Sequence, residues 1–274
     1  MGITFTEIPK KSVTVANTEK VDVSRILDFE GQYLRTGSIE GYLPLKKASD
    51  STVFISDERL DKPHGSGVIL NHGGKKYLIT ATHVIGTKAL GKPTNLKVFE
   101  RRNDKIKEIK LEDLTMLYAS SSAREQNLPV ADVAIFEYRG DSEGVQLVDP
   151  FEQGTSVAVA IGYPGILLEE WQTTLQPLVS PGKAFIPKKE DKQLTPYLQR
   201  LFEKHGTTNA HKQIPKIIFT GSTSGGNSGG GLFNLEGKLL GICRGPEGTI
   251  GKETGRKEFY PIIQVLKAIA YQSN

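Results

Sequence analysis

The sequence has almost no cysteine and no long apolar run. Cys243 is the single cysteine among 274 residues, so the chain cannot form a disulfide within itself. This argues against a disulfide-stapled secreted protein and favours a reducing compartment. No apolar run approaches the roughly 20 residues of a membrane-spanning helix, and residues 1–20 lack the apolar core of a signal peptide. We therefore expect a cytoplasmic protein without a membrane span.

A strong excess of charge of one sign is missing too. Lys and Arg number 35 against 31 Asp and Glu, which gives a net charge of +4. Nucleic-acid-binding proteins cluster their basic residues on one face, whereas short pairs such as Lys10-Lys11 and Arg101-Arg102 are scattered along this chain. The five histidines show no metal-ligand spacing. We expect no nucleic-acid partner, no metal and no cofactor.

Glycine is plentiful, at 29 residues, and together with 14 prolines it separates many short stretches of β-forming residues. Residues 65–70 and 75–80 flank an Asn-His-Gly-Gly turn, which is typical of a β-hairpin. This spacing predicts an all-β protein, built as a barrel or a sandwich. The other expected strands cover residues 52–55, 96–100, 106–111, 133–136, 157–161, 216–220, 231–234 and 238–243.

Two helices are expected to interrupt the β pattern. The first covers residues 195–206, with Thr195 as N-cap, Pro196 in the first turn and Gly206 at the end. It lies in a polar stretch, residues 165–215, which we interpret as an insertion where a regulatory partner could bind.

The second expected helix covers residues 261–271. Its apolar side chains share one face, which should pack on the body of the protein; they are Ile262, Val265, Leu266 and Ile269. At the other end of the chain, residues 1–50 are polar and mixed. We interpret them as an N-terminal extension that packs on the same body.

A glycine-rich stretch around one serine is the most distinctive feature of the chain. Residues 225–231 read Gly-Gly-Asn-Ser-Gly-Gly-Gly, so five glycines surround Ser228. Glycine is favoured where the backbone takes a positive φ or approaches another group closely. A serine held there exposes its hydroxyl, and the neighbouring N–H groups can converge on one point, as a nucleophile beside an oxyanion hole requires. For such a run taken alone, a flexible Gly/Ser loop is the alternative interpretation.

A serine nucleophile needs a base within hydrogen-bond reach and a group that orients the base. His83 ends the stretch Thr-Ala-Thr-His, where a predicted strand leaves the core. Asp132 begins the stretch Asp-Val-Ala-Ile, and a carboxylate at the mouth of an apolar strand is costly to bury unless a group such as a histidine N–H pairs with it. Taken singly, both residues have plain structural interpretations, and Asp104 and Asp113 are rival acids in the same interval.

The three stretches follow one another in the order His, Asp, Ser, with gaps of 132 − 83 = 49 and 228 − 132 = 96 residues. With this order, the chain resembles the chymotrypsin-fold (trypsin-like) serine proteases from about residue 50 onward. The Gly-Ser-Gly at 65–67 and the Gly-Ile-Cys-Arg-Gly at 241–245 also match the layout of that family. With its asparagine and no disulfides, the Gly-Asn-Ser-Gly-Gly motif is most similar to the Htr-type, glutamyl-endopeptidase-like and viral branches of the family.

The resemblance implies an all-β protease domain at residues 51–274, with two six-stranded antiparallel β-barrels at about 51–145 and 150–260. It implies that Ser228 attacks the scissile carbonyl of a protein or peptide substrate, that His83 transfers the proton, and that Asp132 orients the imidazole. The N–H groups of Gly226 and Ser228 would form the oxyanion hole. A protease fold that has lost activity and serves as a scaffold or binding module is the alternative, and the presence of all three residues disfavours it.

The sequence departs from the digestive enzymes of that family just before the nucleophile. Those enzymes carry an aspartate where this chain has Asn227, and their aspartate pairs with an N-terminal amine released by propeptide cleavage. An asparagine cannot make that ion pair, and no Arg/Lys-Ile-Val-Gly-Gly activation site precedes the first barrel. We therefore predict an activity that does not depend on this kind of cleavage.

The resemblance also places the substrate-binding pocket around Ser222, Arg244, Gly245 and Glu258. Ser222 is uncharged and should lie at the base of the pocket. Glu258 would favour a basic side chain before the scissile bond if it points inward, and otherwise Arg244 could favour an acidic one. If both side chains face solvent, neither sets a charge preference. Cys243 lies in an apolar strand, so we interpret it as a buried structural residue rather than a second nucleophile.

Overall fold

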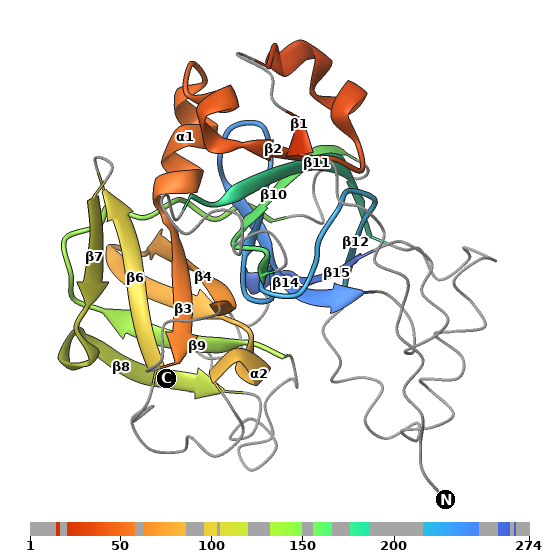
Figure 1. The fold of residues 1–274 in the computed structure, drawn as a ribbon. Coiled ribbons are helices and arrows are strands. Elements are labelled where there is room, and N and C mark those ends of the chain that lie inside the picture. Colours follow the sequence, from red (N-terminus) through yellow and green to blue (C-terminus); the bar gives the residue numbers. More distant parts are fainter. Residues whose placement is uncertain are drawn as a thin grey trace, which may run out of the picture.

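Two β-sheets lie side by side in the computed structural model of this protein, and an N-terminal segment, residues 21–50, runs along one of them (Figure 1). Among the residues that the structure describes, no helix is both long and apolar enough to cross a membrane. The described residues are 15–16, 21–57, 63–85, 96–102, 105–119, 132–149, 156–165, 176–186, 216–246, 257–263 and 266.

The first sheet has seven strands in the order β7-β6-β3-β4-β5-β9-β8, all paired antiparallel. The predicted hairpin is β4–β5, and its turn uses Gly73 and Gly74 at φ of 60° and 76°. The elements are β3 (Thr52–Asp57), β4 (Pro63–His72), β5 (Lys75–Thr80), α2 (Thr82–Ile85), β6 (Leu96–Arg102), β7 (Lys105–Ile109), η3 (Leu111–Asp113), β8 (Leu114–Ala119) and β9 (Ala134–Tyr138).

The two edge strands of this sheet belong to one bent stretch of chain. Only the short 3₁₀ turn η3 separates β7, which pairs with β6, from β8, which pairs with β9. Residues 105–119 thus run from one edge of the seven-stranded sheet to the other, and no pairing of β7 with β8 is found among the described strands. A bend of this kind lets a sheet curl into a barrel without a regular ladder at the seam.

The second sheet closes on itself. Six antiparallel strands form a ring in the order β11-β10-β13-β14-β15-β12, and a further β11–β12 pairing completes it. The all-β fold with a closed six-stranded antiparallel barrel is therefore confirmed. The strands are β10 (Ser156–Gly162), β11 (Leu178–Phe185), β12 (Ile217–Phe219), β13 (Gly231–Phe233), β14 (Leu239–Pro246) and β15 (Lys257–Tyr260).

Strand β11 lies inside the interval 165–215 that the sequence analysis interpreted as an insertion. The interpretation needs correction there, because residues 178–185 are an integral strand of the second barrel. The expected helix at 195–206 lies outside the described residues. Of the expected C-terminal helix, Ile262 and Leu266 are helical and buried, as predicted. Val265 and Ile269 lie outside the described residues.

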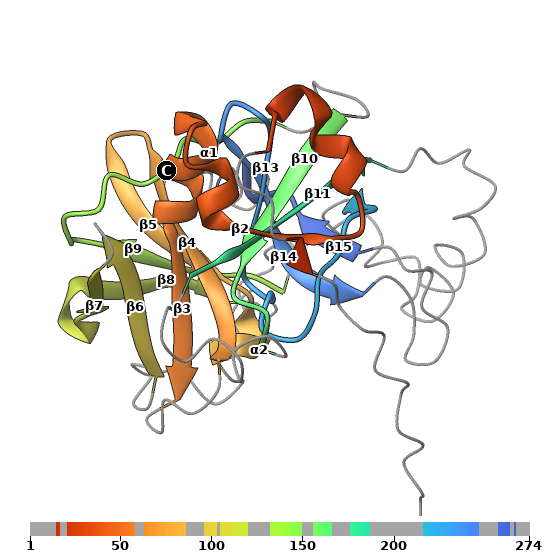
Figure 2. The same ribbon diagram turned by 45° about the horizontal axis from the view of Figure 1, so that its top comes forward.

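The N-terminal segment is attached to the second barrel. Strand β2 pairs with β11 through Leu34↔Val179 and Arg35↔Leu178, and both views place the segment along this side of the barrel (Figure 2). Parallel pairing of β1 with β2 adds one more strand. The elements are β1 (Val15–Ala16), η1 (Val23–Phe29), β2 (Tyr33–Arg35), η2 (Thr36–Ile39) and α1 (Leu43–Asp50).

One apolar cluster joins the N-terminal segment to both sheets. Leu34 and Leu45 from the segment pack with Val68 of β4, Val159 of β10 and Phe233 of β13, all fully buried. Burial of each such side chain contributes about 1.5–3 kcal/mol, so this shared core fixes the three parts against one another. The exact limits of the extension and of the two barrels stay predictions.

Candidate active site

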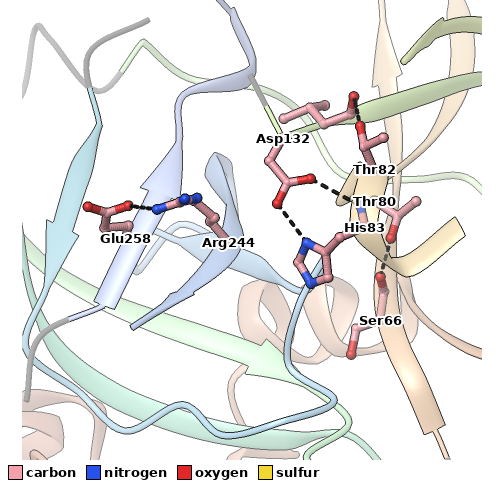
Figure 3. A network of polar contacts seen from close by, with 8 residues as sticks. Ser66, Thr80, Thr82, His83, Asp132, Arg244 and Glu258 are labelled. Atoms are coloured by element: carbon pink, nitrogen blue, oxygen red, sulfur yellow. Dashed lines mark hydrogen bonds and ion pairs between the residues drawn. The ribbon is translucent and has the colours of Figure 1, made fainter. Parts of the chain in front are cut away.

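His83 is held where the chain leaves the first barrel. Strand β5 ends at Thr80, and His83 follows in the short helix α2. The Thr80 hydroxyl donates to the Ser66 carbonyl at 2.7 Å, and the Thr82 hydroxyl donates to the Val133 carbonyl at 2.6 Å (Figure 3). These two hydrogen bonds tie the residues on either side of Ala81 to β4 and to the start of β9, so the backbone at His83 has little freedom.

The Asp132 carboxylate makes two contacts with His83, one to the backbone and one to the ring. Its Oδ1 accepts from the His83 backbone N–H at 3.1 Å, and its Oδ2 lies 2.6 Å from the ring nitrogen Nδ1 (Figure 3). Asp132 is placed there because the next residue, Val133, is fully buried at the entrance of β9. When Nδ1–H is donated to the carboxylate, Nε2 is left free to accept a proton. The sequence-predicted partners are thus brought together.

The environment keeps the Asp132 carboxylate ionised. Burial by itself raises the pKa of Asp132, but the hydrogen bonds and the charge of His83, with a smaller contribution from Arg244, outweigh it, and the pKa lies below its ordinary value. The carboxylate is therefore charged throughout the neutral range. A charged partner at Nδ1 stabilises an imidazolium if His83 takes up a proton.

Ser228 lies beside the two strands that lead to His83. Its carbonyl accepts from the Ser66 N–H at 2.7 Å, and the next residue, Gly229, donates to the Cys243 carbonyl at 2.8 Å. Gly229 has φ of +82°, and a Cβ there would run into the Ser66 carbonyl and the Thr80 hydroxyl. Only glycine fits at this close approach, which explains one part of the glycine-rich motif.

Two backbone donors flank Asn227. Its own N–H donates to the Ser224 carbonyl at 3.0 Å, but the N–H groups of Gly226 and Ser228 donate to no acceptor among the described residues. Gly226 has φ of +94°. Free N–H groups on either side of one peptide are what an oxyanion hole needs. Within the described part of the chain, the Ser228 hydroxyl makes no hydrogen bond to His83; such bonds are often long in free enzymes and tighten with substrate.

Ser66 is a residue of this site that the sequence analysis missed. Its hydroxyl is fully buried, donates to the Gly226 carbonyl at 2.8 Å and accepts from the Tyr163 N–H at 2.8 Å. It therefore links the first barrel to the loop of the nucleophile. The signal was present in Gly-Ser-Gly at 65–67, since a Cβ on Gly65 would come within 2.9 Å of the Ser228 carbonyl of the second barrel.

Two of the predicted pocket residues, Ser222 and Gly245, are uncharged, and the other two, Arg244 and Glu258, form an ion pair. Ser222 donates its hydroxyl to the Gly31 carbonyl at 2.5 Å, and Gly245 lies at a β-bulge between β14 and β15 with φ of +147°. Glu258 is only 1% exposed; its Oε2 lies 2.5 Å from Arg244 Nη1 and 2.7 Å from the ammonium of Lys216. Glu258 is thus not a lone anion, which removes the main argument for a pocket that favours basic side chains.

Cys243 has the surroundings of a structural residue. Its side chain is 2% exposed, and burial raises the pKa of the thiol to about 12. The thiolate is the nucleophilic form, so this thiol is inert at neutral pH. Among the described residues, no group of three or more His, Cys, Asp or Glu side chains could hold a metal ion.

Comparisons with known proteins identify the family and the fold. The family model of the trypsin-like peptidase domain matches residues 65–242, well over half of the chain. A search of curated protein sequences gives no match. Among solved structures, the chain is similar to the HtrA-type protease AlgW with a tripeptide, at 17% identity and a TM-score of 0.53, with 83% of this chain and 61% of that one covered.

A second similar structure is Rv3671c from M. tuberculosis in an inactive form. Its identity is 18% and its TM-score 0.50, with 85% of this chain and 92% of that chain covered. At such identities the structural likeness concerns the fold, and this chain spans about three fifths of the AlgW chain. The family itself follows from the sequence match over residues 65–242. The chain therefore belongs to the trypsin-like peptidase domain family of serine proteases.

Proposed function

We propose that this protein is an endopeptidase that cuts protein substrates through Ser228, His83 and Asp132. The observation that carries the proposal is the pair of contacts from the Asp132 carboxylate to the backbone N–H and the Nδ1 atom of His83, beside a glycine-rich loop that contains Ser228. A histidine whose Nδ1 is fixed by a charged carboxylate is suited to act as a general base through Nε2.

The proposed reaction has two halves. The Ser228 hydroxyl attacks the scissile carbonyl while His83 Nε2 takes its proton, and the oxyanion binds the N–H groups of Gly226 and Ser228. His83 then protonates the leaving amine, which leaves an acyl-enzyme on Ser228. Water attacks the ester with His83 again as base, and the freed acid and Ser228 hydroxyl complete the cycle. Each oxyanion donor contributes about 3–4 kcal/mol in other enzymes.

A fluorophosphonate probe tests this proposal directly. The probe should label the native protein on Ser228, as mapped by mass spectrometry of the digested adduct, and labelled protein should no longer digest an unfolded substrate such as casein. Heat-unfolded protein is the control and should not be labelled. A folded protein that neither takes up the probe nor cuts casein would support the alternative, a silent protease-fold scaffold.

The proposal includes activity without propeptide cleavage. Asn227 donates through Nδ2 to the Tyr33 hydroxyl at 3.1 Å, so its side chain is already paired within the intact chain. Full-length protein with an unprocessed N-terminus should be labelled as fast as any truncated form. Cytoplasmic location and a regulatory partner at residues 165–215 stay predictions.

We further propose that the substrate pocket favours an acidic side chain before the scissile bond. Arg244 has the most exposed side chain of the charged group Arg244, Lys216 and Glu258, at 39% against 19% and 1%, so an acidic substrate side chain would reach it first. In matched peptides, glutamate should be preferred over lysine in kcat/KM by about tenfold, the equivalent of roughly 1.4 kcal/mol.

Two variants test the source of this preference. Arg244→Gln should abolish it, whereas Lys238→Gln, which removes an exposed charge in the turn just before β14, should leave it intact. A preference for lysine, or a glutamate preference that survives Arg244→Gln, would refute the assignment.

A further inference from the structure

We propose that Tyr33, in the N-terminal segment, is a positioning residue that holds the nucleophile loop, residues 220–230, in its active shape. The inference rests on the proposed function and adds to it a role for a residue far from the catalytic motifs. Tyr33 precedes Asn227 by 194 positions, yet the two side chains are joined by a hydrogen bond of 3.1 Å.

The N-terminal segment contacts the loop at three successive points. The Thr220 hydroxyl bonds to the Glu30 carboxylate, the Ser222 hydroxyl donates to the Gly31 carbonyl at 2.5 Å, and Asn227 reaches the Tyr33 hydroxyl. Residues 30–33 thus follow the loop from its start to the residue before Ser228. Because three contacts follow one another, residues 30–33 support the loop along most of its length.

Residues 30–33 are in turn held against the second barrel by the residues that follow them. Leu34 and Arg35, which follow Tyr33, pair with Val179 and Leu178 of β11. The Thr36 hydroxyl donates to the Pro177 carbonyl at 2.5 Å. The Tyr33 ring is 1% exposed, so it cannot swing away without opening the core. A hydroxyl held this firmly can define where Asn227 lies.

Asn227 is the residue whose position matters most for the oxyanion hole. The residues on either side of it, Gly226 and Ser228, carry the two N–H groups that donate to no acceptor among the described residues. Asn227 is 4% exposed, and its Oδ1 has no partner among the described residues, so the bond from Nδ2 to Tyr33 is the only described hydrogen bond of its side chain. Gly225 and Gly226 before it add backbone freedom. The side chain of Asn227 is therefore the anchor that sets the direction of both donors.

The chemistry of this anchor differs from that of an ion pair. A phenol and an amide are both neutral, and burial raises the pKa of Tyr33 further above its usual range, against a smaller lowering by Ser224 and Asn227. The contact therefore does not titrate between acid and moderately alkaline pH. Because it lies within one chain, it is present as soon as the protein folds.

Tyr33→Phe tests the proposal because it removes one oxygen and keeps the buried ring. We expect kcat to fall by about 10- to 100-fold with KM changed less than about twofold, since small misplacements of catalytic groups cost rate rather than binding. Tyr118→Phe is the matched control, because Tyr118 is equally buried in the first barrel; it should keep the wild-type kcat. The double variant with Asn227→Ala should lose no more than Asn227→Ala alone.

Hydrogen–deuterium exchange gives a readout that does not need activity. In Tyr33→Phe, amides within residues 220–230 should exchange faster, while Tyr118→Phe leaves them unchanged. An unchanged kcat in Tyr33→Phe, or unchanged exchange in the loop, overturns the proposal. If the wild type neither cleaves nor labels, the proposed function fails instead, and the exchange experiment alone decides whether Tyr33 holds the loop.

Discussion

Ser228→Ala is expected to lower kcat by about 10⁵-fold or more while leaving the fold intact, because the reaction loses the atom that forms the acyl-enzyme. Alanine fits because the Ser228 hydroxyl makes no described hydrogen bond on which folding depends, and the backbone bond from Ser66 to the Ser228 carbonyl stays. The measurement is hydrolysis of a fluorogenic peptide under saturating substrate, with thermal unfolding as the check on the fold.

His83→Ala should cost nearly as much as Ser228→Ala, and the double variant should cost no more than either single one, because the two groups act as a unit. His72→Ala is the control: His72 lies exposed at the β4–β5 turn and should have no effect on the rate. Additive losses in the double variant would show that His83 does not act through Ser228.

Asp132→Asn is expected to lower kcat by about 10³- to 10⁴-fold. The amide nitrogen can donate to His83 Nδ1, and the proton then moves to Nε2, which can no longer accept from Ser228. Asp113→Asn serves as the matched control, since Asp113 is a rival acid of the same interval and lies in η3, where no described contact links it to His83. A loss from Asp113→Asn similar to that from Asp132→Asn would mean that the wrong acid has been assigned.

The same carboxylate sets an expectation for pH. The pKa of Asp132 is lowered from its ordinary 3.8 in the folded protein. A carboxyl group whose folded-state pKa is depressed contributes stability that is present above its unfolded-state pKa and is lost as pH falls through the folded-state pKa. Wild-type protein should therefore lose this contribution only in acid, and Asp132→Asn should flatten that part of the profile of unfolding free energy against pH.

Much of this site could be predicted from local sequence. The residue types, order and spacing of three short stretches were enough to show the resemblance to the chymotrypsin-fold proteases, and that resemblance paired His83 with Asp132. Strand β11, by contrast, was missed. It contains Pro181 and Gly182, which usually mark turns, yet Pro181 pairs with Val159 inside the barrel. Tertiary pairing there overrides local preference.

Contacts between residues far apart in the chain could not be predicted from the sequence. Nothing near Tyr33 indicates that its hydroxyl would meet Asn227, since the contact depends on the pairing of β2 with β11. The partners of Glu258 were hidden in the same way. Lys216 precedes β12, and only the antiparallel pairing of β12 with β15 brings its ammonium to that carboxylate. Sequence patterns report local structure, and charge neutralisation depends on which strands become neighbours.

The most direct test of the account is a crystal structure of the protein with a peptide boronate bound. The account predicts a covalent bond from boron to Ser228 Oγ, one boronate oxygen within about 2.7–3.1 Å of the Gly226 and Ser228 nitrogens, and His83 Nε2 beside the other oxygens with Nδ1 still on Asp132. A boronate attached to another residue, or bound with His83 turned away from Ser228, would contradict it.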